Sequence, residues 1–166
     1  MQRNPAYTKL LTRIRFTIIF FMVALILSGV TAFPLETELH WLLGFQNHMS
    51  AALAAFIAKV YDALVYTNQH YPMLAYGYDW LAFAHIVIAL FFIGPLQDPI
   101  KNIWVIEWGM LACVAIFPLA FIAGTVRGIP FYWKCIDCSF GVIGIIPLYL
   151  LRGWIKKLSL MTHVKI

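Results

Sequence analysis

Apolar residues along the chain gather in long unbroken runs rather than alternating with polar residues. Four runs have the length of a membrane helix, and they cover residues 16–33, 80–96, 104–123 and 138–154. A helix needs about 20 apolar residues to cross a hydrocarbon core of about 30 Å, and a backbone exposed to lipid must satisfy its own hydrogen bonds. The pattern therefore predicts an all-α fold, a polytopic transmembrane four-helix bundle.

A fifth segment, residues 48–66, is apolar on one face only. At helical spacing its polar face carries His48, Ala52, Ala55, Lys59, Asp62 and Tyr66, and its apolar face carries Leu53, Ile57, Val60 and Leu64. A charged face is typical of a helix that lies in the membrane interface. We therefore predict one additional amphipathic interfacial helix here, and a fifth span is the alternative.

The segments between the runs contain turn-forming residues. Pro72 and Gly77 predict an interfacial loop over residues 68–78, with Asp79 as the N-cap of the following span. A tight polar turn is expected over residues 97–102. The first run is preceded by basic residues, but its length and the absence of a small-residue cleavage pattern favour a retained span over a signal peptide.

Composition supports the same class of protein. The chain has 166 residues, of which 63% are hydrophobic and only 11% are charged, so we expect a single integral membrane domain over residues 1–166. The formal net charge is +5. Because the basic residues lie at the chain ends and span borders, they indicate membrane topology and not nucleic-acid binding.

The distribution of basic residues predicts the orientation. With four spans, one side carries Arg3, Lys9, Arg13, Arg15, Lys101, Arg152, Lys156, Lys157 and Lys165, and the other carries only Lys59, Arg127 and Lys134. Basic loops stay in the cytoplasm. We therefore expect a multi-pass protein of the bacterial inner (plasma) membrane with both termini cytoplasmic.

The outward connection between the last two runs, residues 124–138, is rich in chemically active residues. Arg127, Lys134 and Asp137 lie there beside Tyr132 and Trp133. One interpretation is an interfacial turn closed by an Arg127–Asp137 pair. The other is a ligand-binding corner, in which these five residues hold an anionic head group or a quinone-like ring.

Cys135 and Cys138 in the same connection form a CxxC pattern. Such a pair at a helix N-terminus suits disulfide exchange, which makes it a candidate redox pair. The alternative is that both cysteines are small packing residues while Asp137 or Ser139 caps the last helix. Cys113, inside a span, is predicted to be a packing residue.

Two ionisable residues lie within spans. His85, paired with His48 or His40, is a candidate axial ligand of haem b, and the alternative is an interhelical hydrogen bond. Glu107 is a candidate proton-relay group, and the alternative is pairing with Lys101, Asn102 or the basic N-terminal segment. No histidine and cysteine cluster predicts a metal site.

No phosphate-binding loop, nucleophile motif or paired-carboxylate motif occurs, so the chain gives no support to an enzymatic activity. We expect a small inner-membrane protein that acts by binding, either an accessory or scaffold subunit or a lipid-contacting protein. Its recognition surface would lie on the outer face, its partners being the lipid bilayer and a membrane protein or a second copy of the chain. The alternatives are a membrane redox protein that binds haem b or uses the thiol pair, and a proton or ion pathway.

Overall fold

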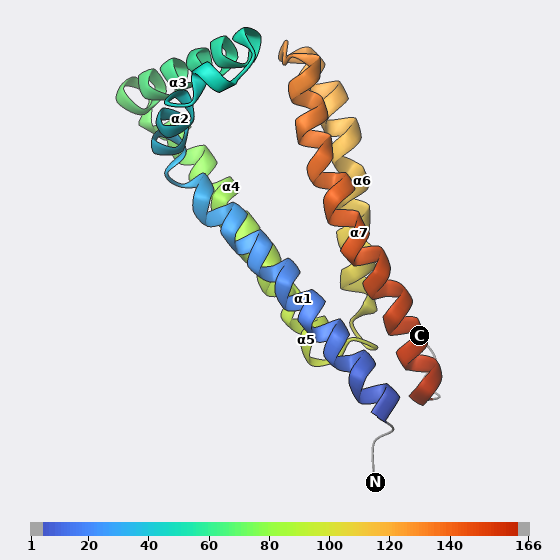
Figure 1. Cartoon of the computed structure of the whole chain (residues 1–166). Helices are drawn as coiled ribbons and strands as arrows, with labels where there is room; N and C mark the ends of the chain where they lie inside the picture. The colour runs from blue at the N-terminus through green and yellow to red at the C-terminus, as the bar shows by residue number, and fades with distance from the viewer. Residues whose placement is uncertain (1–4, 163–166) are drawn as a thin grey trace. The chain divides into compact units, whose positions relative to one another are not determined.

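The computed structural model describes residues 5–162, and every regular element in that part of the chain is helical (Figure 1). The elements are α1 (Pro5–Ala32), α2 (Leu35–Leu43), the 3-10 helix η1 (Gln46–His48), α3 (Ala51–His70), α4 (Pro72–Phe91), α5 (Ile93–Gln97), α6 (Ile103–Val126) and α7 (Phe131–Thr162). Four stretches, namely α1, α4 with α5, α6 and α7, are long and apolar enough to cross a membrane. The predicted all-α fold with four spans is confirmed. Arg3 and Lys165 lie outside the described residues.

The predicted loop over residues 68–78 is wrong. Helix α3 continues to His70 and α4 begins at Pro72, so that only Tyr71 separates them. Proline is well suited to the first position of a helix, because its φ is already helical and an N–H at that position would have no intrahelical acceptor. Asp79 consequently lies inside α4 and is not its N-cap.

Helix α2 was not predicted at all. Its nine residues follow Pro34 directly, and Glu36 and Glu38 lie in its first turn, where carboxylates interact favourably with the helix dipole. The long spans also extend beyond their predicted limits, since α1 includes the basic segment from Pro5 and α7 runs to Thr162. The basic residues within α1 and near the end of α7, namely Lys9, Arg13, Arg15, Arg152, Lys156 and Lys157, are thus helical themselves.

Contacts divide the chain into two compact units: unit 1 contains Met1–Met22 and Phe91–Ile166, and unit 2 contains Val23–Leu90. The core of unit 1 is the pair formed by α6 and α7. The buried positions along α7 are Cys138, Gly141, Leu148, Leu151, Ile155, Leu158 and Ser159. Most of them recur at intervals of three and four residues, the spacing of a helix that packs along a partner helix.

Small residues bring α6 and α7 close together. A Cβ atom placed on Gly141 would lie 2.6 Å from the carbonyl oxygen of Cys113, and one on Gly144 would lie 3.1 Å from the Cys113 sulfur. Glycine at such positions lets two membrane helices approach until their backbones are in contact. Cys113 is therefore a packing residue, as the sequence predicts.

The first helix and the turn before α6 complete unit 1. The Arg15 side chain donates from Nε to the Leu96 carbonyl at 3.2 Å and from a terminal nitrogen to the Gln97 carbonyl at 3.5 Å. In the turn, Asn102 Nδ2 donates to the carbonyl oxygens of Gly94 and Asp98. The predicted polar turn is confirmed, and it ends α5 with its carbonyl groups satisfied.

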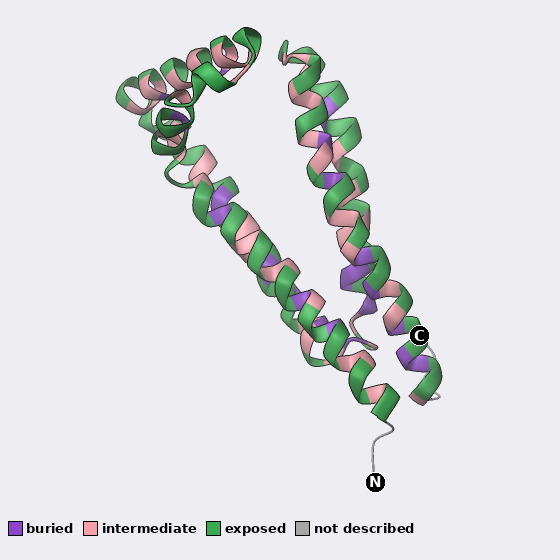
Figure 2. Cartoon of the chain, viewed as in Figure 1, coloured by how far each residue is buried: buried purple, intermediate pink, exposed green. Residues whose placement is uncertain are grey.

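The outward faces of the spans are strongly apolar. Figure 2 shows exposed residues along the whole length of α6 and α7, and on α6 they include Leu119, Ile122 and Val126, at 66%, 67% and 81% exposed. A soluble protein would not expose so much continuous apolar surface. These faces are suited to contact with lipid tails.

In unit 2, α1 packs on α4 through a similar close approach. A Cβ on Gly29 would lie 2.6 Å from the Ala82 carbonyl oxygen and 3.1 Å from the His85 Cβ. Helices α2 and α3, which we call the cap (residues 35–70), have a separate small core made of Leu39, Ile57 and Leu64.

The amphipathic pattern predicted for residues 48–66 agrees with the cap. Ile57 and Leu64 are buried, whereas Lys59 and Asp62 on the opposite face are exposed. Val60 differs from the prediction, since it is 36% exposed. The helix starts later than predicted, at Ala51, because the Ser50 side chain accepts the Leu53 N–H at 3.3 Å and so forms the N-cap.

Candidate functional site

A chain of polar side chains joins three helices of unit 2. Asn68 Nδ2 on α3 donates to Glu36 Oε2 on α2 at 2.5 Å, and the Tyr78 hydroxyl on α4 donates to Asn68 Oδ1. Both bonds are half-buried, and the one to the carboxylate is charge-assisted, the stronger kind of side-chain hydrogen bond. The network fixes the cap on the start of α4.

Sequence reasoning missed this network, because Asn68 and Tyr78 were assigned to a loop. The signal that could have revealed it is Pro72 as the first residue of a helix. If α4 starts at Pro72, Tyr78 lies about two turns into that helix. Helix α3 ends just before α4, so the Tyr78 side chain can reach Asn68 in the last turn of α3.

The surface of the cap carries aromatic and charged side chains. The Tyr66 and His70 rings stack with centroids 4.1 Å apart, and the His40 ring lies 5.8 Å from that of Tyr61. Trp41 is 71% exposed and Phe45 is 61% exposed. The cap thus has a packed, hydrogen-bonded interior and an exposed aromatic surface. Aromatic residues are enriched at protein interfaces and at membrane borders.

The predicted corner over residues 124–138 is mostly helical. Only residues 127–130 are outside helices, and Gly128 has a φ of +66°, the left-handed conformation that commonly ends a helix. Tyr132, Trp133, Lys134 and Asp137 all belong to the first two turns of α7. The corner is therefore a short helix-to-helix turn followed by a helix, and a ligand-binding role for these five residues stays a prediction.

Lys134 is the residue that closes this turn. Its Nζ donates to Thr125 Oγ1 at 3.1 Å, and its aliphatic part packs on Gly124, where an added Cβ would lie 2.9 Å from the lysine Cδ. Within residues 5–162 the ion pairs are Lys101–Asp98 and Arg152–Glu107. The predicted Arg127–Asp137 pair is therefore wrong, because Arg127 ends α6 while Asp137 lies two turns into α7.

Cys135 is exposed and Cys138 is buried, and both are free thiols on successive turns of α7. The predicted cap of the last helix by Asp137 or Ser139 is wrong, since α7 begins at Phe131 and the Ser139 hydroxyl donates to the Ile136 carbonyl at 2.6 Å inside it. A redox role for the thiol pair stays a prediction.

His85 is half-buried at the contact of α4 with α1. Its Nδ1 lies 2.8 Å from the carbonyl of Leu81 in the same helix, so the recorded hydrogen bond is not the interhelical one expected. His48 is exposed on η1, and no recorded contact joins it to His85. Within residues 5–162 no group of three or more histidine, cysteine and acidic side chains is placed to hold a metal ion.

Glu107 forms an ion pair across the α6–α7 contact. Arg152 Nε donates to Glu107 Oε1 at 2.7 Å, and the two side chains are 37% and 44% exposed. The predicted partners Lys101 and Asn102 are wrong, because antiparallel packing brings an arginine from 45 positions later in the chain alongside this carboxylate. Glu107 thus bridges the two spans near their border, and a proton-relay role for it stays a prediction.

Helix content, span length and exposed apolar faces together define a polytopic α-helical membrane protein. Comparisons of the chain with protein-family models, curated proteins and solved structures found no match.

Proposed function

We propose that the protein acts by binding, as an accessory or scaffold subunit of a membrane assembly, and that the cap is its recognition surface. The observation that carries this proposal is the construction of the cap. Its inner face is fixed by the core at Leu39, Ile57 and Leu64 and by the network around Asn68. A preorganised surface loses little conformational entropy on binding, so its contacts contribute more fully to affinity.

The chemistry of the exposed side fits a membrane-protein partner. Trp41 and Phe45 offer apolar contact area, while Lys59 and Asp62 offer charges on the exposed face of α3. Aromatic anchors bordered by polar groups are typical of protein interfaces. A second copy of this chain is the other partner that this surface fits, and the lipid bilayer contacts the spans.

The topology proposed for the protein places the cap outside the cell. Four spans, with the basic ends of the chain in the cytoplasm of a bacterium, put the α1–α4 and α6–α7 connections on the outer side. In unit 1 the Arg13 guanidinium lies 4.1 Å above the Trp154 ring, so the two described chain ends lie at the same end of that unit. This arrangement agrees with an even number of spans.

In-cell photo-crosslinking tests the proposal. A photoreactive amino acid at Trp41 should give a discrete protein adduct, whereas the same substitution at Leu119 on the apolar face of α6 should give lipid adducts only. Both side chains are highly exposed, at 71% and 66%, so the comparison controls for accessibility. Absence of any discrete adduct from Trp41 and from Lys59 would contradict the proposal.

Haem binding is the second candidate, supported by one contact. The Nδ1 atom of His85 is occupied by the Leu81 carbonyl, which fixes the ring and leaves Nε2 for a ligand. An absorption spectrum of the purified protein, oxidised and then reduced with dithionite, separates the two candidates. A Soret band that is lost in His85→Ala would favour the redox function, and a flat visible spectrum would exclude it.

A further inference from the structure

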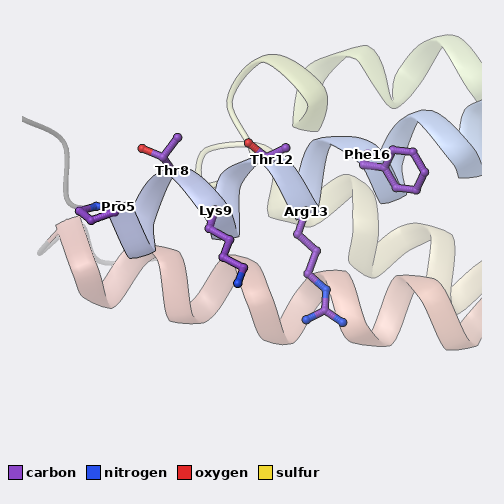
Figure 3. Close-up of a pocket in the computed structure, with 6 residues that line it drawn as sticks. All are labelled: Pro5, Thr8, Lys9, Thr12, Arg13 and Phe16. Atoms are coloured by element: carbon purple, nitrogen blue, oxygen red, sulfur yellow. The ribbon is translucent and has the colours of Figure 1, made fainter.

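An open groove of about 910 Å³ follows one face of α1 near its start (Figure 3). It is lined by Pro5, Thr8, Lys9, Thr12, Arg13 and Phe16. These positions recur at steps of three and four, so they form one continuous stripe of a helix. The stripe changes character along its length, from cations and hydroxyl groups to the exposed ring of Phe16.

The two cations of the groove have no acidic partner in the part of the chain that the structure describes. Within residues 5–162 the ion pairs are Lys101–Asp98 and Arg152–Glu107, so no carboxylate in that part of the chain lies within ion-pair distance of Lys9 or Arg13. The Arg13 guanidinium is held 4.1 Å above the Trp154 ring by a cation–π contact. Figure 3 shows Lys9 and Arg13 projecting from the same side of α1.

A second cavity in unit 1 provides a contrast. It has a volume of about 310 Å³ and is lined in part by Arg15, Asp98 and Lys101. There the arginine donates to backbone carbonyls and the lysine pairs with the aspartate at 3.7 Å. The charged side chains of this cavity therefore have partners within the protein, whereas Lys9 and Arg13 have no carboxylate partner within residues 5–162.

We propose that this groove binds the head group of an anionic phospholipid. Lys9 and Arg13, four residues apart, are separated by about 6 Å along the helix, so that both can contact one phosphodiester. Thr12 lies on the other edge of the stripe and lines the same groove. Towards the membrane, Phe16 and Phe20 are 71% and 63% exposed and continue the stripe as a surface for an acyl chain. Basic grooves at the membrane border are characteristic sites for such lipids.

This inference is independent of the cap, because the groove lies in unit 1 and the cap in unit 2. The site would anchor the basic end of the chain to the negatively charged leaflet and fix the depth of α1 in the bilayer. A zwitterionic lipid fits less well, since its choline group would lie beside two cations.

Native mass spectrometry of the full-length protein in mild detergent tests the site, with phosphatidylglycerol and phosphatidylcholine offered in equal amounts. We expect phosphatidylglycerol to be retained at least about tenfold more strongly, and this preference to be lost in the Lys9→Gln, Arg13→Gln double variant. The matched control is Lys156→Gln with Lys157→Gln, two exposed lysines of α7 outside the groove, which removes the same charge and should keep the preference. Lys9→Gln alone, at an exposed side chain without an ion-pair partner within residues 5–162, removes no contact of the fold that depends on charge and should weaken retention about fivefold.

Three results would overturn the proposal. Equal retention of both lipids would show that the groove is not selective for anions. An equal loss of preference in the control variant would show that only net charge matters. Full competition by soluble glycerol phosphate would show that the groove binds a free anion without contribution from the acyl chain.

Discussion

The cap and the α6–α7 pair are held together by different means, although both are built from helices. The pair is joined by backbone contact at Gly141 and by an ion pair at its border, and its remaining faces are apolar and exposed. The cap has a hydrophobic core, an opposite face with charged residues, and a hydrogen-bond network, as a small soluble helical hairpin would have.

The difference follows from the solvent that each region meets. Between membrane helices there is little hydrophobic driving force, because lipid tails are as apolar as leucine, so close packing of small residues must supply the attraction. In the proposed topology the cap would lie at the membrane surface, where it meets water on one side and gains from burying Ile57 and Leu64. A mutation in the cap core should therefore destabilise the cap alone, and a mutation at the α6–α7 contact should destabilise that pair alone.

The largest effect is expected from Ile57→Ala in the cap core. This side chain is 2% exposed, and its truncation should destabilise the cap by about 2–5 kcal/mol. Hydrogen exchange should report loss of protection over residues 35–70 with α6 and α7 unaffected. Val60→Ala, in the same helix but 36% exposed, is the control and should cost about 0.5 kcal/mol or less. Equal effects of the two variants would contradict the separate core.

Gly141→Ala should destabilise the α6–α7 pair by about 1–3 kcal/mol, because the new Cβ would lie 2.6 Å from the Cys113 carbonyl oxygen and force the helices apart. Unfolding by SDS in mixed micelles measures this. Gly153→Ala is the matched control in the same helix, since its Cβ would meet nothing within 4 Å. The control should be neutral or up to about 1 kcal/mol more stable, because alanine is the better helix former. If Gly153→Ala were destabilised and Gly141→Ala were not, Gly141 would not lie at the α6–α7 contact.

Asn68→Ala should cost the cap about 1–3 kcal/mol, since it leaves the Tyr78 hydroxyl and the Glu36 carboxylate without their partner. The adjacent exposed residue provides the control, and Gln69→Ala should leave hydrogen exchange of the cap unchanged. A double-mutant cycle with Tyr78→Phe should give less than additive loss, because both changes remove the same bond. Strict additivity would mean that the network does not act as a unit.

Glu107→Gln should have the smallest effect, at most about 1 kcal/mol, because the ion pair with Arg152 is more than one third exposed on both sides. SDS unfolding at low and high salt measures it, and the difference between variant and parent should shrink as salt screens the pair. Glu38→Gln, in the exposed first turn of α2, is the control. A loss of unfolding free energy well above about 2 kcal/mol would indicate that the Glu107–Arg152 pair is buried from water.

The sequence pattern predicted those elements that are determined by residues close together in the chain. The four spans follow from the length of their apolar runs, and the buried face of α3 follows from the spacing of Ile57 and Leu64. The polar turn before α6 was also predicted, from its turn-forming residues, of which Asp98 and Asn102 bond to its backbone. These features depend on neighbours within a few positions of each other.

The contacts that define the candidate sites could not be predicted in the same way. Arg152 and Glu107 are 45 positions apart, and Asn68 and Glu36 are 32 apart, so their pairing depends on how the helices pack. Helix α2 was missed because nine residues are too few for a clear period. That Lys9 and Arg13 lack a carboxylate partner within residues 5–162 could be recognised only after the ion pairs of the other charged residues were known.

The central proposal is a topology in which the cap and the two chain ends lie on opposite sides of the membrane. It is tested most directly by a membrane-impermeant maleimide on intact cells, using a chain in which Cys113, Cys135 and Cys138 are replaced by alanine. Lys59→Cys on the exposed face of the cap should be labelled in intact cells, and Lys101→Cys, whose parent side chain is 82% exposed, should be labelled only after the membrane is opened. Labelling of both positions from the same side would contradict the four-span arrangement and, with it, the assignment of the cap as an outer recognition surface.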